Sequence, residues 1–187
     1  ITLTDAGMRL RKRAEEIVDL VDKTEAEFLL PEENVCGDVY IGGGETYVMG
    51  HVAQVIKRIQ DEYPLIRFHL YSGNAEDVTE RLAKGLLDFG VLIQPTSLSK
   101  YDHLRLPDVD VWGVLMRNDS PLAGHETIHP EDLWDAPILL SRQRLVSKEM
   151  SSWFKKDTES LNLVATYNLI YIAALCVEQG VGYMRYA

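Results

Sequence analysis

Cysteine is scarce in this sequence, because only Cys36 and Cys176 occur among 187 residues and they lie far apart. Two isolated cysteines form neither a disulfide framework nor a zinc-binding spacing, and both fit a reducing compartment. Cys176 falls on an apolar helical pattern, where a core position is expected. Long apolar runs are also missing, and no signal peptide opens the chain. We therefore expect a cytoplasmic protein that makes no contact with a membrane.

Positive charge is in short supply as well, since the formal net charge is -10. The one tight basic cluster runs from Arg9 to Arg13, where a solvated helix face is the favoured interpretation. Affinity for a phosphate backbone depends on clustered Lys and Arg side chains. We therefore expect no direct contact of this chain with DNA.

Patterns that carry catalysis or metal binding are absent too. The five histidines do not form a ligand constellation, and His125 and His129 are separated from any helix by Gly124 and Pro130. No nucleophile elbow, catalytic cysteine motif, P-loop or dinucleotide fingerprint occurs. The sequence therefore predicts no enzyme activity, no metal site and no cofactor.

What the sequence does contain begins with a long helix predicted over residues 5–30. Thr4 is the expected N-cap, and Asp5 suits the positive end of the helix dipole. Apolar residues recur at alternating four- and three-residue spacing, which is typical of a coiled-coil seam that needs a partner helix. These seam positions are Leu10, Ala14, Ile17, Val21, Thr24 and Phe28. The alternative is a helix packed on its own domain; we favour pairing between two copies.

After a hinge at residues 31–34 the pattern changes to strands alternating with helices. Strands are expected at 39–41, 66–70 and 89–93, with amphipathic helices between them. Such alternation is typical of a parallel sheet with crossover helices. A break at residues 94–97 leads to a second set of strands, at 109–116, 137–140, 163–165 and from 181 onward. We predict an α/β protein with a first lobe over 35–94 and a second lobe over 95–187.

The two ends of the sequence indicate a piece of a longer protein. The chain begins with Ile1 instead of methionine, and it stops inside the strand predicted to start at Val181. A fold does not normally end in mid-strand. We therefore expect the second lobe to be incomplete at its C-terminal end.

Several short motifs, in their order and spacing, resemble the LysR family of bacterial transcription regulators over essentially the whole chain. They are ITLTDAG at 1–7, GDVYIG at 37–42, YP at 63–64, GLLDFGV at 85–91, NDSPL at 118–122 and LCVEQGVGY at 175–183. Each motif alone is weak, whereas their order and spacing together are specific. The resemblance implies a long dimerising linker helix followed by a two-lobed, periplasmic-binding-protein-like (type II) sensor domain.

The same resemblance implies a function. Members of the family carry an N-terminal winged helix-turn-helix, pair through the linker helix, often form tetramers, and respond to a small molecule held between the lobes. The DNA-reading helices are missing from this sequence. We therefore expect operator DNA to be contacted only by that missing N-terminal part of the protein. The alternative is a solute-binding protein of the same two-lobed fold, which would carry a cleavable apolar segment in place of the coiled-coil seam of residues 1–30.

Candidate effector contacts follow the predicted strands, because ligands of open α/β sheets lie beyond the carboxyl ends of the strands. The candidates are Glu45, Thr46, Ser72, Gln94, Ser141 and Thr166. Each also fits a helix cap or a turn former, and Thr46 rests mostly on the family resemblance. Arg142 and Arg144 are weaker candidates for pairing with a carboxylate ligand. We expect a small polar or anionic effector.

Overall fold

The computed structural model describes residues 3–28, 35–94, 96, 98–142 and 148–186. The chain forms two compact units. The first comprises residues 1–44 and 49–103, and the second comprises residues 45–48 and 104–187. Within the described residues, no helix is both long enough and apolar enough to cross a membrane.

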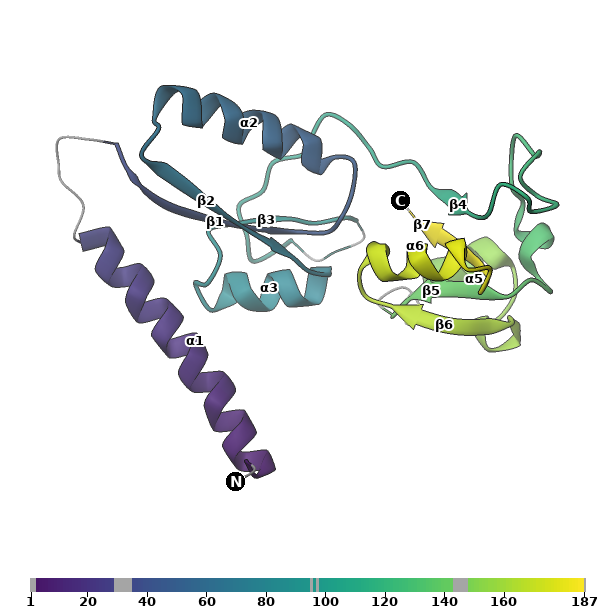
Figure 1. Ribbon diagram of the computed structural model, residues 1–187, viewed down its shortest axis with the longest axis horizontal. Helices are drawn as coiled ribbons and strands as arrows, with labels where there is room; N and C mark the ends of the chain where they lie inside the picture. The colour runs from purple at the N-terminus through teal and green to yellow at the C-terminus, as the bar shows by residue number, and fades with distance from the viewer. Residues whose placement is uncertain (1–2, 29–34, 95, 97, 143–147, 187) are drawn as a thin grey trace. The chain divides into compact units, whose positions relative to one another are not determined.

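The first unit is built on a three-stranded parallel sheet in the order β2-β1-β3 (Figure 1). Its elements are α1 (Asp5–Phe28), β1 (Gly37–Gly43), α2 (Met49–Glu62), β2 (Ile66–Ser72), α3 (Ala75–Ala83) and β3 (Phe89–Val91). Helices α2 and α3 cover opposite faces of this sheet. The predicted parallel sheet with crossover helices is confirmed.

Glycines in β1 let these two helices approach the sheet closely. A Cβ atom on Gly42 would lie 3.3 Å from the Val78 side chain of α3 and 2.4 Å from the Leu87 side chain. One on Gly43 would lie 3.0 Å from the sulfur of Met49, the first residue of α2. Among the described residues, the glycines with positive φ are Gly37, Gly85 and Gly180. Gly42 and Gly43 therefore belong to the strand and make room for packing, and neither of them needs a positive φ.

The second unit contains a four-stranded sheet in the order β4-β7-β5-β6, in which β4 is antiparallel to β7 and the other pairs are parallel. Its elements are β4 (Gly113–Leu115), β5 (Ile138–Ser141), α5 (Lys148–Phe154), β6 (Leu163–Tyr167), α6 (Ile170–Glu178) and β7 (Tyr183–Tyr186). Two short 3-10 helices lie at Pro130–Leu133 and Thr158–Ser160.

The core of the second unit lies on both faces of β5. Ile138 and Leu140 pack with Phe154 of α5 on one face, whereas Leu139 packs with Val177 of α6 on the other. Side chains of successive strand residues point to opposite faces, so a continuous apolar strand requires cover on both sides. All five side chains are almost fully buried.

The predicted N-cap Thr4 of α1 is present, and Asn74 caps α3 in the same way. The Thr4 hydroxyl accepts a hydrogen bond from the Gly7 amide at 3.1 Å, and the Asn74 side chain accepts from the amides of Glu76 and Asp77. Each cap satisfies backbone donors that the first turn of a helix leaves free. The predicted hinge at residues 31–34 lies outside the described residues.

Helix α1 exposes its predicted seam. Leu10 is 71% exposed, Ile17 is 63% exposed and Val21 is 49% exposed, and Ala14 is exposed beside them. The side chain of Phe28 lies outside the described part of the chain. Apolar side chains in a row along one helix face, left open to solvent, are a surface that a partner would cover.

Candidate functional site

The segment that follows β1 carries two of the predicted effector contacts, Glu45 and Thr46. Residues 45–48 are grouped with the second unit, although β1 and α2 on either side belong to the first. Thr46 is half-buried, and its hydroxyl oxygen is fully buried with no hydrogen-bond partner among the described residues. Leaving a buried hydroxyl unsatisfied costs about 1–3 kcal/mol, so such a group is ready to bond a ligand.

Glu45 lies at the N-terminus of α6. Its Oε2 atom accepts a hydrogen bond from the Ile170 amide at 3.2 Å. The first amides of a helix point outward and carry partial positive charge, which favours a carboxylate there. The protein's own carboxylate therefore occupies a position at which an anionic group would also be stabilised.

Ser141 and Thr166 lie on neighbouring parallel strands of the second unit. Ser141 is the last residue of β5 and is half-buried. Thr166 was expected just after a strand, but β6 continues to Tyr167 and pairs Thr166 with Leu140. Hydrogen bonding to β5 extends β6 beyond its apolar residues. Thr166 is therefore an exposed residue within β6, near the carboxyl end of that strand.

Ser72 and Gln94 are in the first unit. Ser72 ends β2 beside Gly43, the last residue of β1, and its side chain is exposed. Gln94 follows β3, and its side-chain oxygen accepts from the Thr96 amide at 3.3 Å. Both residues lie at the carboxyl edge of the first sheet, as predicted, and Gln94 additionally acts as a local turn former.

Of the two arginines proposed to pair with a carboxylate, Arg142 is exposed directly after β5. Arg144 lies outside the described residues. Within the described part of the chain, no group of three or more His, Cys, Asp or Glu side chains could hold a metal ion.

A buried arginine that the sequence did not single out lies in β7 of the second unit. Arg185 is 8% exposed, and its guanidinium carbon lies 4.2 Å from the centre of the Trp112 ring and 4.7 Å from that of Trp153. Its Nη1 atom lies 3.2 Å from the Met150 sulfur. Stacking on aromatic faces stabilises a partly desolvated guanidinium. No local motif could have indicated it, because its partners come from distant segments.

Glu16 and Asp38 are two of the carboxylates in the first unit whose pKa is lowered. Hydrogen bonds from Lys84 and Arg13 lower the pKa of Glu16 from 4.5 to about 2. A hydrogen bond with His69, followed by one from Arg67, lowers the pKa of Asp38. Both carboxylates are therefore charged at neutral pH and are held by cations or hydrogen-bond donors.

Comparison with known proteins connects this arrangement to one family. The family model of the LysR substrate binding domain matches residues 32–185. The regulator YvbU of Bacillus subtilis is 28% identical over 140 residues, which are 75% of this chain and 47% of YvbU. The regulator IlvY of Escherichia coli is 21% identical over 158 residues, which are 84% of this chain and 53% of IlvY. Both are named HTH-type transcriptional regulators, and the chain spans about half the length of each.

Solved structures share the fold. The effector-binding domain of QuiR, determined in complex with shikimate, matches with a TM-score of 0.67 at 14% identity, covering 81% of this chain and 73% of that one. The cofactor-binding domain of the Cbl regulator matches with a TM-score of 0.58 at 19% identity, covering 83% and 69%. The predicted α/β, periplasmic-binding-protein-like (type II) class is confirmed. This chain belongs to the LysR substrate-binding-domain family.

Proposed function

We propose that this chain is the effector-binding and self-association part of a LysR-type transcription regulator. In this proposal residues 1–30 form the linker helix, residues 35–94 the first lobe and residues 95–187 the second lobe. The curated relatives are transcriptional regulators, which favours this function over the solute-binding alternative. Operator DNA would be bound by a part of the protein outside this sequence, because the chain is acidic.

The observation that carries the sensing function is the buried, unpartnered hydroxyl of Thr46, three residues after the end of β1. Buried polar groups are normally satisfied, so an orphaned one at the carboxyl end of a parallel sheet is a natural ligand contact. Ser72, Gln94, Ser141 and Thr166 are the proposed further contacts, at the strand ends of the two units. We propose that the effector binds between the two lobes of the sensor domain.

The chemistry of the candidate contacts favours a small polar or anionic molecule. Hydroxyl and amide groups predominate, and the α6 N-terminus suits a carboxylate. Glu45 already lies at that helix end. An anionic effector group would have to displace it, whereas a neutral or amine-bearing group could bind beside it. The effector-binding domains of QuiR, in complex with shikimate, and of BenM, with its effector benzoate, share the fold, and both of these molecules are small carboxylates.

Self-association is proposed through the exposed seam of α1. Apolar side chains at coiled-coil spacing are buried when a second helix packs against them, and this burial stabilises the helix pair. A homodimer through this helix, with a homotetramer as the larger assembly, is the proposed oligomeric form. The proposed effector site and the proposed seam lie on different segments, so each can be tested without the other.

A thermal-shift screen tests the sensing function. The panel should contain small organic acids, hydroxy acids and amino acids at millimolar concentration. A ligand that binds only the folded state at about 100 times its Kd stabilises that state by about 2.7 kcal/mol. We expect at least one compound to raise the melting temperature of the parent and to raise that of Thr46→Val less. Equal shifts in the two proteins would contradict the proposed contact.

A further inference from the structure

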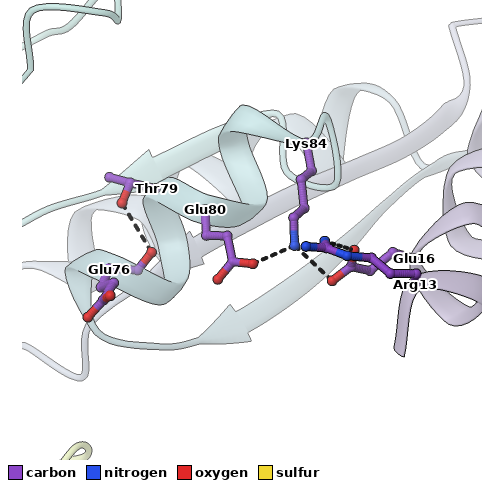
Figure 2. A network of polar contacts seen from close by, with 6 residues as sticks. All are labelled: Arg13, Glu16, Glu76, Thr79, Glu80 and Lys84. Atoms are coloured by element: carbon purple, nitrogen blue, oxygen red, sulfur yellow. Dashed lines mark hydrogen bonds and ion pairs between the residues drawn. The ribbon is translucent and has the colours of Figure 1, made fainter. Parts of the chain in front are cut away.

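Helix α1 is attached to the body of the first unit through charged side chains, on a face separate from the seam. Figure 2 shows Glu16 of α1 beside Lys84, the C-cap residue that follows α3. Lys84 Nζ lies 2.8 Å from Glu16 Oε1, and the other Glu16 oxygen lies 2.7 Å from Arg13. Both oxygens of Glu16 are therefore occupied, and one of them is bonded to a residue far away in sequence.

A second attachment lies two turns further along α1. Lys23 Nζ lies 2.5 Å from Asp88 Oδ1 and 3.2 Å from the Gly85 carbonyl oxygen, and it sits 4.9 Å from the centre of the Tyr40 ring. Only 12% of the Lys23 side chain is exposed. A lysine that places its ammonium group on a carboxylate, a carbonyl and an aromatic face is specifically held.

Asp88 links this attachment to the sheet. Its second oxygen accepts from the Tyr40 amide of β1 at 2.8 Å, and its own amide donates to the Tyr40 carbonyl. Asp88 immediately precedes β3, and β1 leads directly to the segment that contains Thr46. Lys23 is thus bonded to the residue that joins two strands of the sensor sheet.

The attached face and the seam are different faces of α1. Glu16, Leu20 and Lys23 follow an i, i+4, i+7 spacing and so share one face, with the Leu20 side chain close to Gly85. At 100° per residue, the centre of the seam that contains Ile17 and Val21 lies about 110° around the helix. The seam stays exposed while the other face is bound.

We propose that the pairs Glu16–Lys84 and Lys23–Asp88 form a latch that holds α1 in a fixed orientation on the first unit while its seam remains free for a second copy. The latch itself is inferred from the contacts of Glu16 and Lys23 within one chain. Its consequence rests on the proposed self-association: two copies joined at the seam would have their sensor sheets rigidly connected to the dimer helix. A change at β1 or β3 would then alter the geometry of the dimer.

The latch can be tested by a distance measurement within one chain. Spin labels are placed at Met8→Cys on α1 and Gln60→Cys on α2, in a Cys36→Ser/Cys176→Ser background. Both positions are exposed, and Met8 lies on neither the attached face nor the seam of α1. The labelled protein is diluted into unlabelled protein, so that pulsed electron spin resonance reports only distances inside a chain. We expect a single narrow distribution in the parent, because the latch fixes α1.

The test variant is Lys23→Met/Lys84→Gln, which removes both ammonium groups and keeps the aliphatic stems. We expect its distance distribution to widen at least twofold. The matched control is Arg11→Gln, which removes an exposed ion pair with Glu15 inside α1 and should leave the distribution narrow. The single variants serve in place of the double one if circular dichroism shows that the double one is unfolded.

The outcomes separate the latch from the proposed self-association. A broad distribution in the parent, or an unchanged narrow one in Lys23→Met/Lys84→Gln, would overturn the latch. Sedimentation of the same double variant should give the parent's oligomeric state, because the seam is untouched. A parent that sediments as a monomer would contradict the proposed self-association and would leave the distance measurement valid.

Discussion

Replacing Ile17 and Val21 with Asp should convert the protein from a dimer or larger assembly into a monomer. Both side chains lie on the exposed seam of α1, at 63% and 49% exposure. In a paired seam the new carboxylates would face their copies across a desolvated interface, where like charges repel strongly and cannot be hydrated. Sedimentation velocity at micromolar concentration measures the result directly.

The matched control replaces two exposed β-branched apolar residues outside α1 with Asp. Val109 and Val111 are 75% and 80% exposed in the second unit, so Val109→Asp/Val111→Asp adds the same charge without touching the seam. We expect that control to sediment like the parent. If the parent is a dimer and Ile17→Asp/Val21→Asp is still a dimer, then the seam is not the interface.

Truncating Phe154 to Ala should strongly destabilise the second unit. The Phe154 side chain is 0% exposed and packs with Leu133, Ile138 and Leu140 in the core beside β5. Replacing a buried Phe with Ala costs about 3–5 kcal/mol through lost burial and the remaining cavity. We expect the second unit of Phe154→Ala to unfold at a lower urea concentration than that of the parent.

Tyr171→Ala is the control for that measurement, because Tyr171 is an aromatic residue of the same unit that is 70% exposed. Surface truncations of this kind usually change the free energy of unfolding by about 0.5 kcal/mol or less. A loss at Phe154 as small as the loss at Tyr171 would mean that the core of the second unit is not packed as described.

The periodicity of the sequence was sufficient to predict most elements. Strands were predicted at 39–41, 66–70 and 137–140, and the structure has Gly37–Gly43, Ile66–Ser72 and Ile138–Ser141. Apolar runs bounded by turn residues locate the centre of a buried strand well. The ends were missed because cross-strand hydrogen bonds recruit polar residues and glycines, such as Thr166 and Gly43, that local pattern assigns to loops.

Contacts between residues far apart in the chain could not be predicted from the sequence. Glu16 and Lys23 of α1 are bonded to Lys84 and Asp88, and no sequence pattern identified any of these four residues as a contact. Nothing in the spacing of a charged residue tells whether its partner is solvent or a side chain more than 60 positions away. Pairing of the seam between copies stays a prediction.

The candidate site was predictable only as a set of strand ends. Sequence pattern placed Thr46 after a strand, but the burial of its hydroxyl without a partner depends on the packing around residues 45–48. The bond from Ile170 to Glu45 likewise joins segments 125 positions apart. The sequence shows which chemical group each candidate residue carries. The neighbours and the burial of that group can be seen only in the folded structure.

Calorimetric titration of the parent, Thr46→Val and Thr166→Val with the most stabilising compound from the thermal-shift panel tests the central claim most directly. Valine keeps the shape of threonine and removes the hydroxyl, so a change in affinity reports a lost hydrogen bond. One such bond is worth about 0.5–1.5 kcal/mol, and 1.4 kcal/mol is a factor of ten in Kd. The account predicts binding that weakens by about twofold to tenfold in Thr46→Val, with the fold intact by circular dichroism. Unchanged affinity in both variants would contradict it and place the effector elsewhere.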